Sequence, residues 1–222
     1  MAIIQCKNVT LKSWARINHT KKNSNLNDLM RSGNTKLPST TGIFNFASAT
    51  DCPSKRKGLC KACQQGAKCY AVKSENDMRK AVLPFRRRQE AYWKHVSAKS
   101  FVSEFVFLNA QKEVPYTAIR FSEAGDFHSQ YCVDKIEEIA MMLRRFGVRV
   151  YGYTSRSDLN FSKVRHAIIT GSNFKKKGIA NTFRIVRDVK KERLKGESVC
   201  KGDCRVCRLC LMHNMRIIVK KH

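Results

Sequence analysis

The sequence predicts an α/β fold with a partial (β/α) barrel-like parallel sheet, a basic N-terminal arm and a C-terminal cysteine-cluster segment. Three features of the 222-residue chain indicate this architecture. Short apolar stretches in its centre alternate with helical periodicity, which is the pattern of β–α–β units. The N-terminal residues are polar and rich in Asn, Lys and Ser. Residues 200–210 read CKGDCRVCRLC, which places four cysteines in eleven positions.

Length and composition predict the domain organisation. We expect a basic polar arm over residues 1–41 and one α/β domain over residues 42–222. Hydrophobic residues make up 42% of the chain, which is enough for a buried core. The sequence has no run of about 18 apolar residues and no signal-peptide layout at its start. We therefore expect a cytoplasmic protein with no membrane partner, whose ten cysteines are metal ligands or core residues and form no disulfides.

The first half of the domain is expected to begin with a strand at GIFNFA, residues 42–47. A cysteine-bearing loop over residues 51–71 follows this strand. Two helices come next. Pro84 suits the first turn of one helix, and FVSEFVFLNA at 101–110 indicates the other.

The clearest pattern begins with the strand YTAIRF at 116–121. Residues 129–147 then place apolar side chains at helical spacing, and Gly147 suits the end of a helix. The next strand is VRVYGYTSR at 148–156. Consecutive strand, helix and strand predict parallel neighbours with a right-handed crossover. Further strands are expected at HAIITGSN (166–173) and FRIV (183–186).

The C-terminal cysteines are Cys200, Cys204, Cys207 and Cys210, separated by three, two and two residues. A structural zinc site usually takes two ligands from each of two distant knuckles. A cubane iron–sulfur cluster instead takes one thiolate at each iron, which suits short repeated spacings. The spacing therefore favours a [4Fe–4S] cluster, with zinc as the alternative.

A second cysteine set lies upstream, at Cys52, Cys60, Cys63 and Cys69. Its looser spacing is compatible with a zinc knuckle or a second cluster, or with one thiolate lent to the C-terminal cluster. One or two clusters are therefore expected. Cys132 opens the amphipathic helix and is expected to be a core residue.

The net charge of +27 points to a polyanionic partner. Such an excess of positive charge repels itself unless a polyanion relieves it, and nucleic acid is the commonest cytoplasmic polyanion. RNA is slightly favoured over DNA, since the sequence contains no helix-turn-helix or other duplex-reading motif. The oligomeric state stays open. The candidate contacts are Lys55, Arg56, Lys57, Arg86, Arg87, Arg88, Lys175, Lys176 and Lys177.

Polar residues at two predicted strand ends form a candidate pocket: Arg120, Asp126, Tyr153 and Arg156. Such a group could bind a nucleotide or position a cluster. The alternative is that Asp126 caps the following helix and pairs with Arg120 or Arg156.

Several motifs together resemble the bacteriophage "gene product 88"-like family, over about residues 42–210. They are GIFNF, TDCPSK, Cys69-Tyr70-Ala71, IRFSEAGDF, YGYTSR and CKGDCRVCRLC. The resemblance implies a viral protein of the host-cell cytoplasm with an iron–sulfur site. It implies no particular enzymatic activity.

The expected function is that of a phage iron–sulfur cluster-binding protein that binds nucleic acid, with a structural or redox-sensing cluster. A radical S-adenosylmethionine-like or other redox enzyme is the first alternative, because Cys200, Cys204 and Cys207 have the spacing of such enzymes. Cys210 could close the open iron, however, and the motif follows the strands instead of preceding them. A binding protein is therefore favoured over an enzyme, and no catalytic residue is assigned. A zinc-stabilised interaction protein is the other alternative.

Overall fold

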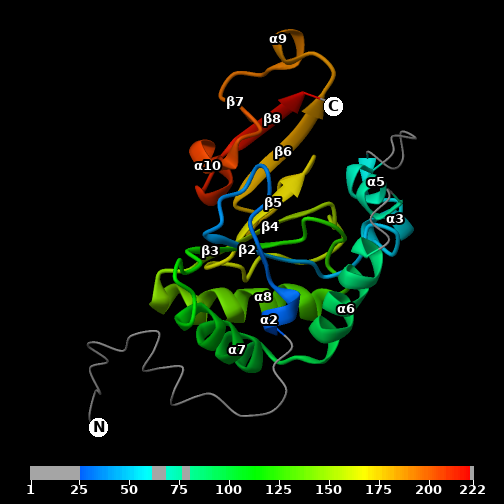
Figure 1. The fold of residues 1–222 in the computed structure, drawn as a ribbon. Coiled ribbons are helices and arrows are strands. Elements are labelled where there is room, and N and C mark those ends of the chain that lie inside the picture. The colour runs from blue at the N-terminus through cyan, green and yellow to red at the C-terminus, as the bar shows by residue number, and fades with distance from the viewer. Residues whose placement is uncertain (1–25, 62–68, 77–80, 221–222) are drawn as a thin grey trace.

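A computed structural model describes residues 26–61, 69–76 and 81–220 of the chain. Its strands form one open sheet in the order β1-β2-β3-β4-β5-β6-β8-β7 (Figure 1). β1 pairs antiparallel with β2, and every other pair is parallel. The predicted α/β class with a barrel-like parallel sheet is therefore confirmed. The strands are β1 (Arg31–Ser32), β2 (Thr41–Phe44), β3 (Ala118–Phe121), β4 (Arg149–Thr154), β5 (Ile168–Ser172), β6 (Asn181–Val186), β7 (Ser198–Val199) and β8 (Arg216–Lys220).

The helices cover the sheet unequally. The longest three, α6, α7 and α8, lie on one face, whereas α10 lies on the other (Figure 1). None of the described helices is long and apolar enough to cross a membrane. The helical elements are α2 (Leu26–Leu29), α3 (Pro53–Arg56), α5 (Tyr70–Asn76), α6 (Val82–His95), α7 (Ala98–Ala110), α8 (Gln130–Leu143), η1 (Arg144–Phe146), α9 (Val189–Glu192), α10 (Cys204–Cys207) and η2 (Leu209–Leu211).

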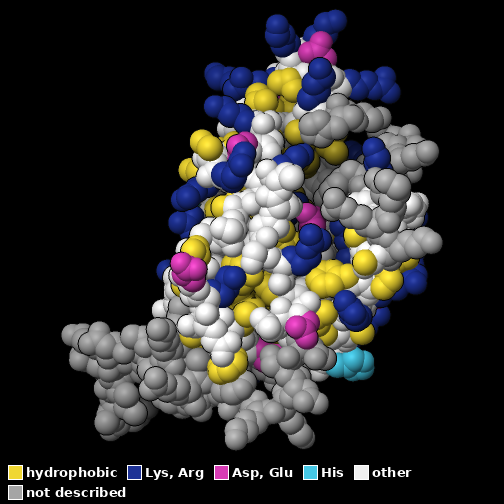
Figure 2. Space-filling view, in the orientation of Figure 1, with side chains coloured by type: hydrophobic (Ala, Val, Ile, Leu, Met, Phe, Trp, Pro, Cys, Tyr) yellow, Lys and Arg dark blue, Asp and Glu magenta, His cyan; other side chains and the backbone are white. Residues whose placement is uncertain are grey.

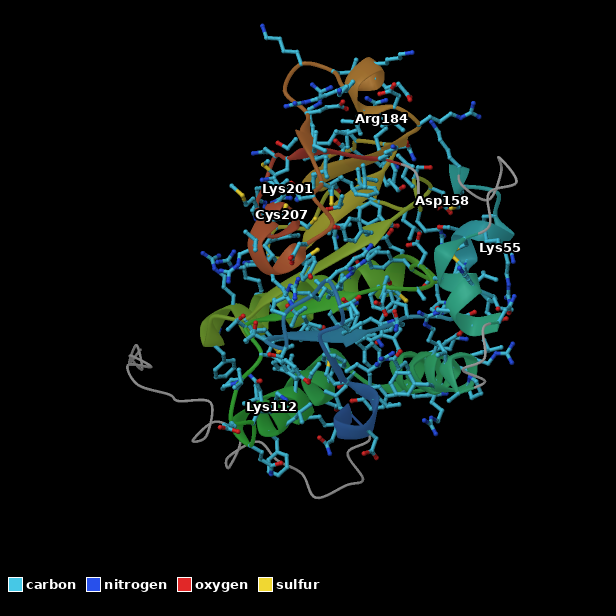
Figure 3. All side chains as sticks on the ribbon, turned by 45° about the horizontal axis from the view of Figure 1, so that its top comes forward. Lys55, Lys112, Asp158, Arg184, Lys201 and Cys207 are labelled. Atoms are coloured by element: carbon cyan, nitrogen blue, oxygen red, sulfur yellow. The ribbon has the colours of Figure 1, made fainter. Side chains whose placement is uncertain are left out.

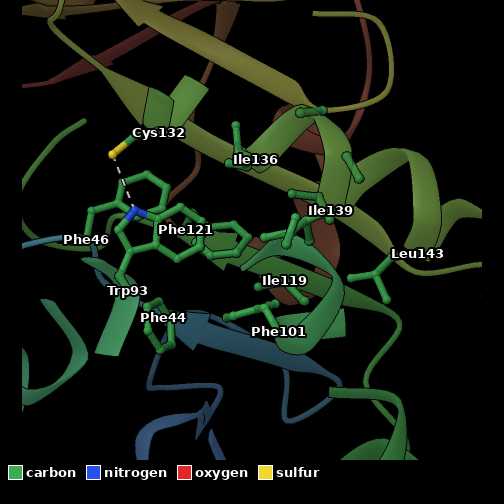
Figure 4. Close-up of a cluster of buried hydrophobic side chains, with 14 of the residues drawn as sticks. Phe44, Phe46, Trp93, Phe101, Ile119, Phe121, Cys132, Ile136, Ile139 and Leu143 are labelled. Carbon is green, nitrogen blue, oxygen red and sulfur yellow. Dashed lines mark hydrogen bonds between the residues drawn. The ribbon is translucent and has the colours of Figure 1, made fainter. Parts of the chain in front are cut away.

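The main core fills the space between the sheet and the three long helices. Aromatic rings from β2, β3, α6 and α7 meet there (Figure 4). Phe46 stacks on Phe121 with ring centroids 5.1 Å apart. Trp93 is fully buried beside them and donates its indole N–H to the Cys132 sulfur at 3.4 Å. Cys132 is therefore a core residue, as the sequence predicts.

Side-chain alternation along the strands gives the sheet a second, different face. In β3, Phe121 points into the main core and Ala118 points away from it. In β4, Val150 belongs to the main core, whereas Tyr151 belongs to a small cluster on the opposite face. This second face carries the C-terminal cysteine segment.

Two parts of the chain differ from the sequence prediction. Residues 26–41, assigned to the polar arm, contribute α2 and β1, and Leu26 and Leu29 are buried in the main core. The first 25 residues lie outside the described part. No strand was predicted after residue 186, yet β8 inserts between β6 and β7 with Ile217 and Ile218 buried. Residues 216–220 read RIIVK, an apolar β-branched run that is typical of a strand, and the prediction omitted it. Its place between β6 and β7 joins residues that are distant in sequence.

Candidate metal centres and basic rim

The C-terminal cysteines are presented by a short, sharply turning segment. Cys200 follows β7, and the single-turn helix α10 carries Cys204 at its start and Cys207 at its end. Arg208 adopts a left-handed conformation, with φ of 50°, which turns the chain into η2 and Cys210. All four thiols are partly exposed.

This segment rests on the second face of the sheet. Cys210 and Leu211 pack against Ala118, Tyr151 and Ile168. The Tyr153 hydroxyl donates a hydrogen bond to the Cys210 sulfur at 2.5 Å. On the other side, the Cys204 N–H donates to the Lys36 carbonyl at 3.0 Å. The cysteine segment is therefore attached to the rest of the protein at two points, Cys210 and Cys204.

Arg120 is the cation beneath these thiols. Its guanidinium lies 5.2 Å from the centre of the Tyr153 ring. The pKa of Cys210 is raised to about 11, chiefly by burial; the hydrogen bond from Tyr153 and the charge of Arg120 oppose this increase, whereas the thiols of Cys204 and Cys200 add to it. Burial also raises the pKa of Cys204; Arg120 lowers it, whereas Cys200 and Cys207 raise it. The four thiols thus share one electrostatic environment.

The donor chemistry of this group fits a thiolate-bound metal. Sulfur ligands select soft centres such as zinc or iron–sulfur clusters, and a bound metal would replace the thiol protons whose loss is here unfavourable. In the described ranges, no three His, Cys, Asp or Glu side chains are gathered closely enough to hold one metal ion. The ligand assignment therefore stays a prediction.

The upstream cysteine loop begins just after β2, where the parallel strands end. Cys52 precedes α3 and Cys69 precedes α5, whereas Cys63 lies outside the described residues. Burial raises the pKa of Cys52 to about 12, and the nearby Asp126 and Cys60 contribute to the increase. The thiols of Cys52 and Cys60 therefore lie close enough to interact.

Asp126 fastens α3 to the end of β4. The carboxylate is 4% exposed and accepts four hydrogen bonds. The Ser54 hydroxyl donates at 2.6 Å, and the Thr154 hydroxyl donates at 2.7 Å. The backbone N–H groups of Phe127 and Ser155 donate at 2.8 Å each. Burial raises the pKa of Asp126, and these four donors oppose that shift.

A buried ion pair fastens the entry of the same loop. The Glu75 carboxylate accepts the backbone N–H groups of Ala49 at 2.7 Å and Thr50 at 2.9 Å. Arg86 donates to Glu75 at 2.7 Å and to the Ala71 carbonyl at 3.0 Å. Burial opposes ionisation of Glu75, but its hydrogen bonds outweigh burial and lower its pKa. The start of the loop is thereby tied to α5 and α6.

The two cysteine sets lie on different parts of the molecule. Lys55 of α3 and Cys207 of α10 are on opposite sides in Figure 3, as are α3 and α10 in Figure 1. The interactions of Cys52 are with Cys60 and Asp126, whereas those of Cys210 are with the other C-terminal thiols. The described upstream thiols are thus not placed to complete the C-terminal set.

The three predicted nucleic-acid-binding stretches come together around the upstream loop. Arg56 and Arg87 both pair with Asp51, each at 3.0 Å. Lys57 pairs with Asp158 at 3.1 Å, and Lys176 donates to the carbonyl oxygens on either side of Asp158. We call this set the basic rim. Its exposed cations are Lys55, Arg56, Lys57, Arg87, Arg88, Lys175, Lys176 and Lys177.

One predicted contact is wrong, and two have additional roles. Arg86 has a side chain only 6% exposed and is paired with Glu75, so it cannot reach a surface ligand. Lys175 donates to the carbonyls of Ile179 and Ala180, so it also holds its own loop. Lys176 likewise bridges to the loop of Asp158.

The four predicted pocket residues do not act as one group. Arg120 and Tyr153 lie beneath the C-terminal thiols. Arg156 makes a two-point contact with Asp158, at 2.6 and 2.8 Å, and also donates to the Phe127 carbonyl. Asp126 binds Ser54 and Thr154 as described above, and the N-cap of α8 is Ser129. The alternative prediction that Asp126 caps the following helix is therefore wrong, because Ser129 occupies the N-cap position of α8.

The acids that organise the basic rim were missed at the sequence level. Asp51 and Asp158 each draw two cations together, and Glu75 neutralises Arg86. The sequence did contain a signal for these acids, since the chain has only 17 acidic residues against 44 basic ones. An acid next to a basic stretch was therefore a candidate organiser.

A second basic surface lies over α9 and the neighbouring strands, at the top of the molecule (Figure 2). Its exposed cations include Lys190, Lys191, Arg193 and Lys195.

Comparison with protein families gave one match. A family model described as Gene product 88 matches residues 10–175, which is most of the chain. The match contains the upstream cysteine loop and ends before the cysteines at 200–210. It also begins within the segment 1–41, which the sequence resemblance did not include. Searches among curated proteins and among solved structures found no match.

Proposed function

The chain belongs to the Gene product 88 family, and from this premise we propose that it is a phage iron–sulfur protein that binds nucleic acid through its basic rim. One observation carries the cluster proposal. Four thiols of residues 200–210 share one environment on the sheet, above the Arg120 guanidinium and the Tyr153 hydroxyl. Hydrogen bonds and positive charge near ligating sulfurs stabilise an anionic thiolate cluster and influence its potential.

The proposed role of this cluster is structural or redox-sensing. The segment that carries the four cysteines is short, and the Val206 side chain in its helix is 81% exposed. Apolar burial therefore contributes little to holding the segment in place. A cluster bound by Cys200, Cys204, Cys207 and Cys210 would supply folding free energy there, because ligand binding and local folding are coupled.

Nucleic-acid binding is supported by the assembly of the basic rim from three separate stretches of the chain. Cations that gather on one surface give sequence-independent affinity for phosphate. Binding of a single-stranded RNA oligonucleotide should fall steeply as salt rises from about 50 to 200 mM. The Lys55→Gln/Lys57→Gln variant should bind more weakly and show a shallower salt dependence.

The decisive experiment for the cluster is anaerobic purification followed by iron, sulfide and zinc analysis. The wild type should be brown, and Cys204→Ser should lose iron and sulfide. Cys132→Ser is the matched control. Cys132 lies in the main core, so this substitution should leave the iron content unchanged. A colourless wild type that contains zinc would replace the proposal with the zinc-stabilised interaction protein.

A second candidate is a redox or radical S-adenosylmethionine-like enzyme, and one observation favours it. The upstream cysteine loop follows β2, the first parallel strand, at the edge where parallel sheets place ligands. The objection that the cysteine motif follows the strands instead of preceding them applies only to the C-terminal cysteines. Consumption of S-adenosylmethionine by the anaerobic, reduced protein would support the enzyme function. If none is consumed, the nucleic-acid-binding function stands as the proposal.

A further inference from the structure

We propose that the second basic surface over α9 is a further nucleic-acid-binding site, and that a single strand runs from it along the edge of the sheet to the basic rim. The inference rests on the proposed function and extends it, because the basic rim does not include this surface. The exposed cations of the second basic surface are Arg187, Lys190, Lys191, Arg193, Lys195, Arg216 and Lys220.

The second basic surface stands on a chain segment with a defined backbone. Residues 187–197 connect β6 to β7, and all three of their acids bind groups close to them. Asp188 and Glu192 each accept two backbone N–H groups of this segment, at 2.8 to 3.3 Å. Glu197 is 6% exposed, and its carboxylate pairs with Arg184 of β6 at 2.8 Å. The acids are therefore used to shape the segment.

Arginines of the neighbouring strands hold the same segment. Arg184 of β6 donates to one of its carbonyl oxygens at 2.6 Å, and Arg216 of β8 donates to another at 3.3 Å. Lys190, Lys191 and Lys195 are exposed, and no ion pair of theirs is found among the described residues. The segment is thus held without these three lysines, whose charges are left for a polyanion.

Strand order places this surface on the same edge of the sheet as the basic rim. Strands β2 to β6 are parallel neighbours, so their carboxyl ends share one edge, where open parallel sheets bind ligands. In the basic rim, α3 follows β2 and the 175–177 loop follows β5, whereas α9 follows β6 (Figure 1). The cations therefore form one series along this edge, with the 175–177 loop between its two ends.

The length of the series identifies the ligand as a chain of phosphates. Adjacent strands lie about 4.8 Å apart, so the four steps from β2 to β6 cover about 19 Å. Stacked nucleotides repeat about every 3.4 Å along one strand, so about six phosphates are needed for this distance. A mononucleotide or a free phosphate would reach only one end, whereas a longer strand reaches both.

An anionic membrane is the other large polyanion to compare. Peripheral membrane binding usually relies on an amphipathic helix with a broad apolar face. Helix α9 has only four residues, VKKE. The exposed apolar side chains near it are Ile185 and Leu194, which come from different elements, β6 and the loop after α9. Nucleic acid is therefore the favoured ligand.

The dependence of RNA affinity on strand length tests the inference. Single-stranded RNA of about five nucleotides reaches one end of the series, and RNA of about twenty nucleotides reaches both. Lys190→Gln/Lys191→Gln should bind the longer RNA about tenfold more weakly than the wild type, because the second point of attachment is lost. Its affinity for the shorter RNA should change by at most about twofold, since the basic rim still binds it.

Salt dependence and a matched variant complete the test. Loss of two phosphate contacts should reduce the slope of log K against log salt concentration by about 1.4 for the longer RNA. Arg144→Gln/Arg145→Gln removes the same charge from η1, which precedes β4 and so lies at the opposite edge of the sheet. This control should keep the wild-type affinity and slope. Thermal unfolding of every variant checks that the fold is intact.

Each contrary result has a separate meaning. If Lys190→Gln/Lys191→Gln binds the longer RNA as the wild type does while Lys55→Gln/Lys57→Gln binds it weakly, the inference is refuted and the proposed function stands. If the wild type binds neither RNA, both fail. Two long strands bound per protein would refute the bridging strand. Phosphatidylserine vesicles that bind the wild type but not Lys190→Gln/Lys191→Gln, with RNA binding unaffected, would assign the surface to a membrane instead.

Discussion

Replacement of Asp126 by Ala should destabilise the protein strongly. The carboxylate is 4% exposed and accepts two backbone N–H groups and two hydroxyl groups. A buried donor left without its acceptor costs about 1–3 kcal/mol. The hydroxyls of Ser54 and Thr154 can rotate toward other acceptors, so the two N–H groups of Phe127 and Ser155 dominate. We expect a loss of about 3–5 kcal/mol in the free energy of unfolding.

The substitution Asp126→Asn separates charge from shape. Asn keeps one carbonyl oxygen for two of the donors, but its NH₂ group faces the other two. The expected loss is about 2–3 kcal/mol, intermediate between wild type and Asp126→Ala. Asp134→Asn is the matched control, because Asp134 is exposed on α8 and should change stability by less than about 0.5 kcal/mol.

Urea unfolding followed by tryptophan fluorescence measures these differences, since Trp93 is buried in the main core. Limited proteolysis adds a local readout, because loss of the Ser54 contact should expose the chain near α3 before the rest unfolds. If Asp126→Ala unfolds at the same urea concentration as Asp134→Asn, the carboxylate is not the fastening that these hydrogen bonds indicate.

Three further results are expected. The pKa of Glu75 lies below its ordinary value of 4.5, so folding favours the charged carboxylate. Its stabilisation is full above about pH 4.5 and is lost as the pH falls through the lower folded-state pKa, so Glu75→Gln should weaken the fall in stability below about pH 4.5. Gly178 has φ of +86°, and a Cβ there would lie 1.6 Å from the Phe161 carbonyl oxygen, so Gly178→Ala should lower stability by more than about 1 kcal/mol in urea unfolding. Ile218 in β8 is fully buried, so Ile218→Ala should lower stability by about 2–5 kcal/mol and increase proteolysis of β7.

Each of these expectations has a contradictory outcome. If the stability of Glu75→Gln falls at low pH as much as that of the wild type, the ion pair with Arg86 contributes nothing to folding. A fully stable Gly178→Ala would mean that its loop relaxes without strain. A stable Ile218→Ala with intact β7 would show that β8 does not hold the edge of the sheet, and Ile185→Ala, at an exposed position of β6, is its matched control.

Local sequence pattern determined the centre of the fold. Strands β2 to β6 and helices α6 to α8 were predicted because apolar periodicity is set by which side chains each element must bury. The apolar run of β8 was a local signal that the prediction omitted, whereas its position between β6 and β7 joins residues that are distant in sequence and could not be read from local pattern. The burial of Leu26 and Leu29 was missed because the polar residues around them dominate the local composition.

By itself, the sequence determined which residues carry the thiol and cationic side chains on which the proposals rest, because cysteine spacing and charge are properties of the chain. Only the tertiary structure decided where that chemistry lies. Arg86 and Arg87 are neighbours in sequence, yet helix α6 turns the first into a buried pair with Glu75 and the second outward to Asp51. The same geometry separates two cysteine sets that look alike as spacings, since position on the sheet depends on strand order and not on distance along the chain.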